Sequence, residues 1–489
     1  YNQEKIDKYI QSIESELEEL DYNDPKDKRK IASREQKISN IKAGIFTTKK
    51  EQELIRPINL GSSVDLPALM YSEEGFHFEV IKNNESGKPS TDEETLTNLR
   101  LTVKKPDSPK AIFLDRLLEL RGLEKMYKTY IEGWNEKVQD DDRLHGRFLI
   151  HGTTSGRLSS AEPNAQQIPK TSVDPNIKLQ LKAPKGTLYI ASDFSQAELR
   201  IMAHLSGDET YLNAFNSGQD PHLAIAATKY HIPYEEALKI YEDENHPEHK
   251  IWKVRRKQAK QIAFGLIYGI GAKLLAVKLS DPKSGIIVTP EEAQKEMDIF
   301  FGQHPKLKTF LKKQEKFLRK NGHLVSLFGR KRRLPQIYSN DKGEEAYALR
   351  LALNFPCQSA ASDMCLFGSI LIYYLMRQGK LPSTKSVCLV HDANYQITKP
   401  ENINIWSIYE MWQIYRNPLT KPYFGFQIDD VTMDMEFVIG RSMAEELPFI
   451  PGYDYKKMLE PDFSVEEYME EHKKYKHIPI SEYKKRFNK

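Results

Sequence analysis

The sequence predicts a multidomain globular protein of mixed α and β structure, in which long helical segments are interrupted by a few short strands. Its 489 residues are 39% hydrophobic, which is enough apolar material for several packed cores. Long segments such as residues 251–279 combine basic and apolar residues in a helical pattern. Short apolar and β-branched runs, such as LYIASDF at 188–194, have the composition of strands.

The N-terminal segment predicts an antiparallel pair of helices. Apolar residues between positions 1 and 20 recur at alternating intervals of four and three, and Asp24-Pro25 ends this pattern. A second, basic segment carries four isoleucines on one face: Ile31, Ile38, Ile41 and Ile45. From these residues alone, we interpret the pair as a packing arm.

Local composition predicts the remaining elements. Residues 83–92 are rich in Asn, Ser, Gly and Pro and predict a loop, after which Ser90 or Thr91 can cap a helix. Further helices are predicted over residues 251–279, 290–320 and 346–375, with a break at Pro282–Gly285. Strands are predicted at 188–194, 387–390 and 394–398, and a basic hairpin at 322–334.

The charge balance excludes a histone-like polycation. The sequence has 72 Lys and Arg against 69 Asp and Glu, so a polyanionic partner must be met by local clusters of charge.

No apolar run approaches the roughly 18–20 residues that span a bilayer, and the first residues lack the pattern of a signal peptide. The three cysteines are too few for a disulfide framework in a chain of this length. We therefore expect no membrane partner and a reducing compartment, the cytoplasm. The richness of the sequence in Lys, Asn, Ile and Tyr suggests an AT-rich genome, and so a bacterium or a virus-infected bacterium.

One predicted helix carries two cations and two aromatic rings at regular intervals. Arg256, Lys260, Phe264 and Tyr268 are each four residues apart, and four residues of an α-helix turn through about 400°, so they share one face. Such a face can hold phosphate oxygens with its cations and a flat base with its rings. Taken alone, a surface helix with a solvated basic end and core-facing rings is the better interpretation.

Two aspartates follow predicted strands in the same way. Asp193 lies at the end of the strand 188–194, and Asp392 lies in the turn after the strand 387–390. Carboxylates held by rigid strands can share two divalent cations about 3.5 to 4 Å apart, which activate an attacking oxygen and neutralise a leaving phosphate. Each acid by itself is more simply a cap or a turn former. The sequence leaves open whether the two meet.

Together, these segments resemble motifs of the family A DNA polymerases, the group of bacterial DNA polymerase I. DFSQAELRIMAHLSGD (193–208), RRKQAKQIAFGLIYG (255–269) and LVHDA (389–393) are similar to motifs A, B and C. Three further segments also resemble the family: TTSGRLSSAEPNAQQIP (153–169), GRKRRLP (329–335) and RLALNFPCQSAASD (350–363). Six motifs in the family's order argue against chance.

The resemblance implies an α+β right-hand fold with a thumb, a palm that holds an antiparallel sheet, and helical fingers. The implied segments are thumb 1–85, first palm part 86–205, fingers 206–345, second palm part 346–449 and a charged C-terminal extension 450–489. The implied activity is template-directed addition of deoxynucleotides to a primer 3′-OH by two-metal phosphoryl transfer, with release of pyrophosphate. Its partners would be primer–template DNA and deoxynucleoside triphosphates (dNTPs).

The resemblance also implies roles for single residues. Asp193, Asp392 and the main-chain carbonyl of Phe194 would hold two Mg²⁺ ions, and Lys260 would act with the two aspartates as a catalytic residue. The incoming nucleotide would be bound by His222, Arg256, Lys260, Phe264, Tyr268 and Glu198. Glu198 would exclude a 2′-hydroxyl. Primer and template would be contacted by Arg157, Asn164, Gln166, Arg350, Asn354, Gln358 and His391.

The sequence departs from the family's pattern in places. Ala393 replaces the usual glutamate of motif C, so no third acid is available there, and Phe194 replaces a common tyrosine. No segment resembles a proofreading exonuclease, and we interpret the acidic sequences at 92–94 and 434–436 as structural. The tail at 451–489 is expected to be peripheral, either as a solvated helix or as a docking site for another replication protein.

Two other functions are alternatives. A single-subunit RNA polymerase shares the right-hand plan, but it has no use for Glu198 and Phe264 as a gate against the 2′-hydroxyl. A catalytically inactive DNA-binding replication scaffold would have no need of the two aspartates together with Arg256 and Lys260.

Overall fold

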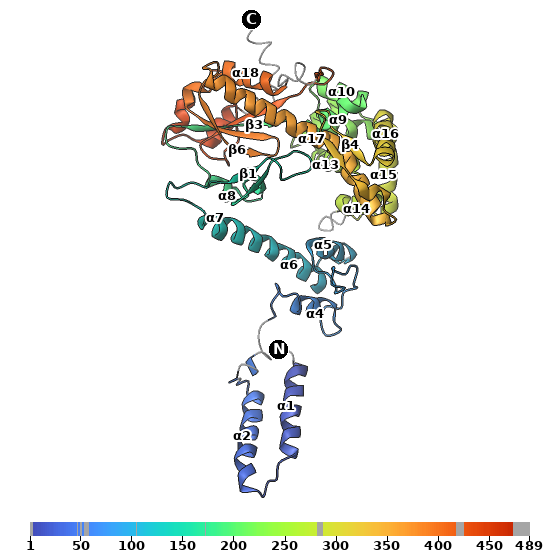
Figure 1. Ribbon diagram of the computed structural model, residues 1–489, viewed down its shortest axis with the longest axis vertical. Coiled ribbons are helices and arrows are strands. Elements are labelled where there is room, and N and C mark those ends of the chain that lie inside the picture. The colour runs from blue at the N-terminus through green and yellow to red at the C-terminus, as the bar shows by residue number, and fades with distance from the viewer. Residues whose placement is uncertain are drawn as a thin grey trace. The chain divides into compact units, whose positions relative to one another are not determined.

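The computed structural model describes residues 3–45, 47–48, 51–52, 58–103, 105–171, 173–280, 287–416 and 425–472. The chain divides into two compact units, Tyr1–Gly122 and Leu123–Lys489 (Figure 1). The predicted break at Pro282–Gly285 and the part of the tail at 473–489 lie outside the described residues.

The first unit begins with the predicted helical hairpin, which is confirmed. Helices α1 (Gln3–Glu18) and α2 (Pro25–Lys42) bury isoleucine and leucine side chains against each other. Asp24 caps α2 by accepting a hydrogen bond from the Lys26 main-chain N–H, and Pro25 suits the first helical turn, where its missing N–H costs nothing.

Three more helices form a second core in this unit: α4 (Asp65–Tyr71), α5 (Glu93–Thr102) and α6 (Pro109–Met126). The last turn of α6 extends beyond Gly122, the last residue of the first unit. The N-cap of α5 is Asp92, so the prediction of Ser90 or Thr91 is wrong. The Asp92 carboxylate accepts from the Thr95 N–H, where a charged oxygen also interacts favourably with the helix dipole. Ser90 Oγ instead accepts from the Asp92 N–H. The structural interpretation of the acids at 92–94 is confirmed.

An antiparallel sheet lies in the second unit (Figure 1). It has five strands in the order β6-β7-β3-β8-β9. Its strands are β3 (Leu188–Phe194), β6 (Thr384–Val390), β7 (Ala393–Thr398), β8 (Met435–Gly440) and β9 (Leu447–Pro448). The first five residues of the central strand β3 are buried, which explains its continuous apolar sequence. The three predicted strands are confirmed.

Helices make up most of the rest of this unit, so the predicted α+β class is confirmed. After the η1 turn (Tyr127–Glu132), its helices are α7 (Gly133–Asn135), α8 (Pro175–Leu179), α9 (Ala197–Ser206), α10 (Glu209–Asn216), α11 (Pro221–Lys229), α12 (Tyr234–Glu242), α13 (His249–Ile267), α14 (Ala272–Leu279), α15 (Pro290–Gln303), α16 (Pro305–Asn321), α17 (Lys342–Arg377), α18 (Ile405–Arg416) and α20 (Val465–Glu471). Short elements complete it: hairpins β1 (Arg147–Leu149)–β2 (Ser159–Ala161) and β4 (His323–Val325)–β5 (Lys331–Arg333), and turns η2 (Ala165–Gln167), η4 (Pro335–Tyr338), η5 (Pro400–Asn402) and η6 (Tyr455–Leu459).

Two long predicted helices are each broken once. The segment 251–279 becomes α13 and α14, because Gly269 has a φ of 67°, a left-handed conformation that ends a helix. The segment 290–320 becomes α15 and α16, because Pro305 lacks the N–H that a continuous helix needs. The hairpin predicted at 322–334 and the helix predicted at 346–375 are confirmed by β4–β5 and by α17.

Helix α17 is long and apolar enough to cross a membrane by length and composition, so the expectation of no such segment is wrong. Half of its apolar window is buried inside the protein, which is typical of a core helix and makes this weak evidence for a membrane span. The C-terminal segment also differs from the expectation. Tyr455, Met458 and Tyr468 are buried in the core of the second unit, so this part of the tail is not peripheral.

Candidate active site

The two aspartates predicted to act together lie at neighbouring positions of the sheet. Asp193 lies on β3 directly opposite Ala393 on β7, the residue that follows Asp392 in the β6–β7 turn. In this turn His391 has a φ of 55°, and Gln196, three residues after Asp193, has a φ of 59°. The left-handed region costs free energy for residues other than glycine, so the surrounding structure holds the chain in sparsely populated conformations beside both carboxylates.

Asp193 lies in a region of excess negative charge. Its side chain is exposed, but desolvation by surrounding protein atoms raises its pKa to about 7, with the charges of Asp392 and then Glu436 as further causes. Glu436 on β8 is the direct partner of Asp193 on the other side of β3, and direct cross-strand partners project from the same face of a sheet. Because the three acids repel one another, a cation bound beside Asp193 would stabilise its charged form.

One cation of the chain itself lies among these acids. Arg157 donates from Nη2 to Oε1 of Glu198 at 2.6 Å and to Oδ1 of Asp392 at 3.3 Å. The Tyr268 hydroxyl donates to the other carboxylate oxygen of Glu198. Burial and the Glu198 charge raise the pKa of Tyr268 far above its usual value, so this hydroxyl stays protonated. Residues from three predicted motifs therefore meet beside Asp392.

The predicted cations and Phe264 follow one another along α13, and Tyr268 is the C-cap residue of this helix. Arg256 binds Asp220 with an Nη2 to Oδ2 distance of 2.5 Å. The Lys260 Nζ lies 5.8 Å from the centroid of the Phe264 ring, and the Phe264 and Tyr268 rings stack with centroids 6.1 Å apart. Desolvation and then the charge of Arg256 lower the pKa of Lys260. The rings thus connect the two cations to the Tyr268–Glu198 hydrogen bond.

His222 lies in the first turn of α11, beside this face of α13. The residue is 1% exposed, and its ring centroid lies 5.7 Å from that of Phe264. Neither ring nitrogen has a hydrogen-bond partner among the described residues. Burial lowers the pKa of His222 to about 4, so the imidazole is neutral at physiological pH. An unpartnered buried imidazole is suited to a ligand that supplies the missing hydrogen bond.

Two of the predicted DNA-contacting residues also order the chain locally. Asn164 caps the η2 turn by accepting from the Gln166 N–H at 3.0 Å, and the Gln166 side chain donates to the Leu389 carbonyl at 3.2 Å. The second contact ties η2 to β6, next to the turn that holds His391. Desolvation and then the charge of Arg157 lower the pKa of His391.

The other three predicted DNA-contacting residues lie on α17. Arg350 is exposed, whereas Asn354 and Gln358 are half-buried. The Asn354 Oδ1 is buried and has no hydrogen-bond partner among the described residues. Their spacing of four residues places them along one face of α17, next to the end of α13, where Gly269 approaches the Arg350 backbone closely.

The predicted metal site can be tested for fit on the residues present. Within the described part of the chain, no three His, Cys, Asp or Glu side chains lie close enough together to form a metal cage. Mg²⁺ does not require one, because it binds one or two carboxylates and keeps waters or phosphate oxygens as its other ligands. The raised pKa of Asp193 points to a local need for positive charge. Asp193, Asp392 and the Phe194 carbonyl therefore fit a divalent cation.

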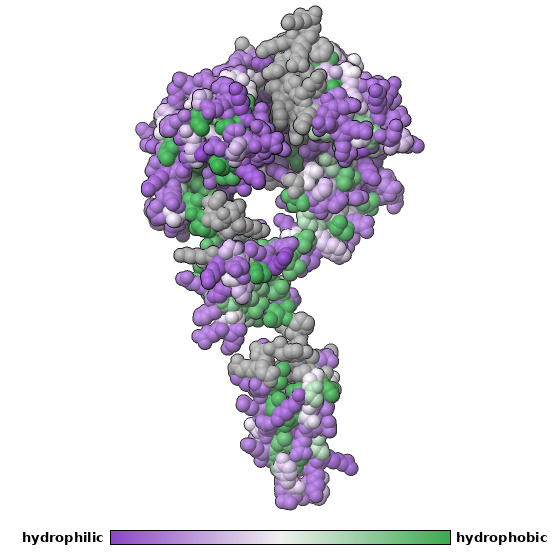
Figure 2. Space-filling view, turned by 180° about the vertical axis from the view of Figure 1, so that it is seen from behind, coloured by the Kyte–Doolittle hydropathy of each residue, from purple (hydrophilic) through white to green (hydrophobic). Residues whose placement is uncertain are grey.

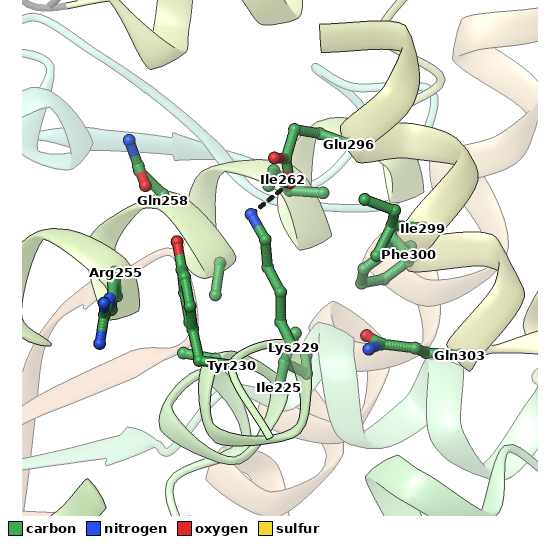
Figure 3. Close-up of a pocket in the computed structure, with 12 residues that line it drawn as sticks. Ile225, Lys229, Tyr230, Arg255, Gln258, Ile262, Glu296, Ile299, Phe300 and Gln303 are labelled. Atoms are coloured by element: carbon green, nitrogen blue, oxygen red, sulfur yellow. Dashed lines mark hydrogen bonds and ion pairs between the residues drawn. The ribbon is translucent and has the colours of Figure 1, made fainter. Parts of the chain in front are cut away.

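A separate pocket lies between α11, α13 and α15 (Figure 3). Its α13 residues, such as Arg255, are on the opposite side of that helix from Lys260, given a turn of about 100° per residue. The pocket holds about 20 Å³, room for a single water, and the Lys229–Glu296 ion pair at 2.6 Å crosses it. Its size and its paired charges exclude it as a nucleotide site.

Comparison with known proteins agrees with the motifs. Residues 26–405 match the family model of DNA polymerase family A. The chain belongs to this family. DNA polymerases of family A use divalent metal ions. The chain is 32% identical over 319 residues to the thermostable DNA polymerase I of Thermus aquaticus, with 65% of this chain and 35% of that protein covered. It is 32% identical over 336 residues to DNA polymerase I of Pseudomonas aeruginosa, covering 68% of this chain and 33% of that protein.

The fold of this family A chain also resembles a solved structure. The POL domain of Pol1 from M. smegmatis, in complex with DNA primer–template and dNTP, matches with a TM-score of 0.65 and 28% identity. The match covers 80% of this chain and 62% of that one, and the chain has the right-hand polymerase fold. The chain spans about a third of the length of the curated relatives that it matches.

Two charged residues of the site were missed by reasoning from the sequence. Glu436, in the sequence 434–436 that we interpreted as structural, is the strand partner of Asp193. Lys170 is exposed and close enough for its charge to lower the pKa values of Lys260 and His391. No local sequence signal points to Glu436. Lys170 directly follows the matched segment 153–169, so its sequence position indicates that it lies near the site.

Proposed function

We propose that this chain is a template-directed DNA polymerase that adds deoxynucleotides to a primer 3′-OH and releases pyrophosphate. Its substrates would be primer–template DNA and dNTPs, and it would act inside the cell. The observation that carries the proposal is the meeting of Asp193 and Asp392 where the neighbouring strands β3 and β7 adjoin at one end, beside the contacts of Arg157 with Glu198 and Asp392. A scaffold that only binds DNA has no need of such a repelling pair of acids.

Asp193, Asp392 and the main-chain carbonyl of Phe194 would hold two Mg²⁺ ions. When bound, these ions would supply activation of the attacking oxygen and neutralisation of the leaving phosphate. Arg256 and Lys260 place positive charge where negative charge develops on the pyrophosphate. Desolvation lowers the pKa of Lys260, which makes its ammonium group a better proton donor to the leaving group.

Nucleotide selection would depend on the residues between the acids and α13. The buried Glu198 is held by Arg157 and Tyr268 and would occupy the place that a 2′-hydroxyl needs. Phe264 would lie beside the sugar and Tyr268 near the templating base, while the neutral His222 would donate to the triphosphate. Primer and template would be contacted by Arg157, Asn164, Gln166, Arg350, Asn354, Gln358 and His391.

The polymerase subdomains would be the thumb 1–85, the palm 86–205 and 346–449, the fingers 206–345 and the C-terminal extension 450–489. Because Tyr455, Met458 and Tyr468 of the extension are buried, docking of another replication protein would have to use its remaining residues.

Single-turnover primer extension tests the proposal. Asp193→Asn and Asp392→Asn should each lower the incorporation rate by several orders of magnitude, while the Kd for primer–template DNA measured by fluorescence anisotropy changes little. Asp298→Asn, at an exposed acid of α15, is the matched control and should incorporate normally. Unchanged incorporation in either active-site variant would contradict the metal role. Efficient extension of the wild type with ribonucleotides alone would favour an RNA polymerase instead.

A further inference from the structure

Helix α16 carries an exposed face of five lysines that the proposed active site does not use. Its sequence contains seven lysine and arginine residues against a single glutamate, in a chain whose net charge is only +3. We define the α16 lysine face as Lys306, Lys312, Lys313, Lys316 and Lys320, all of which are exposed. At about 100° per residue they lie within about 120° of the helix circumference, roughly opposite the buried Leu307, Leu311 and Leu318.

Most of this charge is not neutralised by the protein. Lys306 pairs with Glu209 at 2.6 Å. Among the described residues, no acidic side chain pairs with Lys312, Lys313, Lys316 or Lys320. Like charges at i and i+4, such as Lys312 with Lys316 and Lys316 with Lys320, weaken a helix. A bound polyanion would remove this repulsion.

An aromatic ring lies among these lysines. Phe317 is 44% exposed and follows Lys313 by four residues and precedes Lys320 by three, so the three side chains are neighbours on the helix surface. Among the described residues, its one ring neighbour is His323, at 5.8 Å and nearly perpendicular, which leaves a face of the phenyl ring available. Lysines interleaved with an exposed ring are typical of surfaces that bind single-stranded nucleic acid, where cations contact the backbone and rings stack on bases.

The lysine face is bordered by a groove at one end of α16 and by the start of α17 at the other. Lys306 and Lys313 line a groove of about 310 Å³ together with Ser206 and Thr309. At its other end, α16 is tied to the start of α17 by the Arg319–Glu345 ion pair at 2.6 Å, and α17 carries the predicted DNA contacts farther along. Helix α16 lies at the outer edge of the helical part of the second unit (Figure 1), and hydrophilic residues predominate on the surface of that unit in Figure 2.

We propose that the α16 lysine face and Phe317 bind the unpaired template strand ahead of the primer terminus. This inference rests on the proposed polymerase function, because only that function places a single strand next to α17. The face spans about 21 Å from Lys306 to Lys320, given a rise of 1.5 Å per residue, and so can follow several consecutive nucleotides. The exposed ring favours a single strand over a duplex or an acidic protein, because duplex phosphates and acidic side chains give the ring no base on which to stack.

The test compares two primer–templates that differ only in the 5′ template overhang, which is one nucleotide or about ten nucleotides long. The Kd of each is measured by fluorescence anisotropy at several salt concentrations for the full chain. Three variants are used: Lys313→Gln/Lys316→Gln/Lys320→Gln, Phe317→Ala, and the control Lys239→Gln/Lys295→Gln/Lys380→Gln. The control removes the same charge from exposed lysines elsewhere.

The wild type should bind the long overhang with a lower Kd than the short one. The variant Lys313→Gln/Lys316→Gln/Lys320→Gln should lose this gain in affinity. Its slope of log K against log salt on the long overhang should fall by about 2, because each phosphate contact to a single strand contributes about 0.7. Phe317→Ala should weaken long-overhang binding at least about fivefold without changing the slope. The control variant should keep the gain.

The proposal would be overturned if the α16 variant lost affinity equally for both overhangs, or if the control variant lost as much affinity for the long overhang. Either result would indicate a general charge effect. No overhang-dependent gain in the wild type would overturn it as well. Single-nucleotide incorporation on the short overhang separates this result from the proposed function: it should be normal in all variants, and its absence in the wild type would contradict the polymerase assignment itself.

Discussion

The free energy of unfolding of the His222→Gln variant should fall less at acidic pH than that of the wild type. The ring is almost fully buried and has no hydrogen-bond partner among the described residues. Its pKa is about 4 in the folded protein, whereas an unfolded chain has a histidine pKa of about 6.5. The unfolded state therefore takes up the proton first. The stability associated with the neutral ring is fully present above about pH 6.5 and is lost as the pH falls toward 4.

The size of this effect follows from the two pKa values. The two pKa values differ by roughly 2.5, and each unit of pKa corresponds to about 1.4 kcal/mol, so the complete loss is roughly 3 kcal/mol, of which about 2 kcal/mol is lost by pH 5. Urea unfolding of the wild type and of His222→Gln is measured at about pH 7.5 and about pH 5. Between these pH values, the free energy of unfolding of the variant should fall by about 2 kcal/mol less than that of the wild type. Equal pH dependence in the two proteins would refute the assignment of a buried neutral imidazole.

Two further substitutions test the site and the core. Glu198→Ala should admit ribonucleotides in primer extension, because it opens the buried space held by Arg157 and Tyr268; a variant that still rejects them would remove Glu198 from the proposed gate. Gly368→Ala should lower the free energy of unfolding by about 1–3 kcal/mol, since its Cβ would lie 2.3 Å from the fully buried Tyr415 ring. Gly302→Ala, on a helix with open space around it, is the control and should be neutral or slightly stabilising in the same urea titration.

The elements with strong local signals were predictable from sequence. The strand Leu188–Phe194 is found with its predicted bounds, because a continuous apolar, β-branched run suits a strand buried in the middle of a sheet. Errors arose where one residue decides between two local structures. Asp92 caps α5 in place of Ser90 or Thr91, and Gly269 and Pro305 divide helices whose apolar patterns run on past them.

The sequence by itself determined the residue types of the site, their order in the motifs and the helices and strands that carry them. Only the tertiary structure decided that Asp193 and Asp392 become neighbours, that Glu436 adds a third negative charge, and that Arg157 lies between Asp392 and Glu198. The physical reason is that periodicity and capping act over a few residues. The pairing of β3 with β7 and β8 instead joins segments about 200 to 250 residues apart, through strand register and the packing of a shared core.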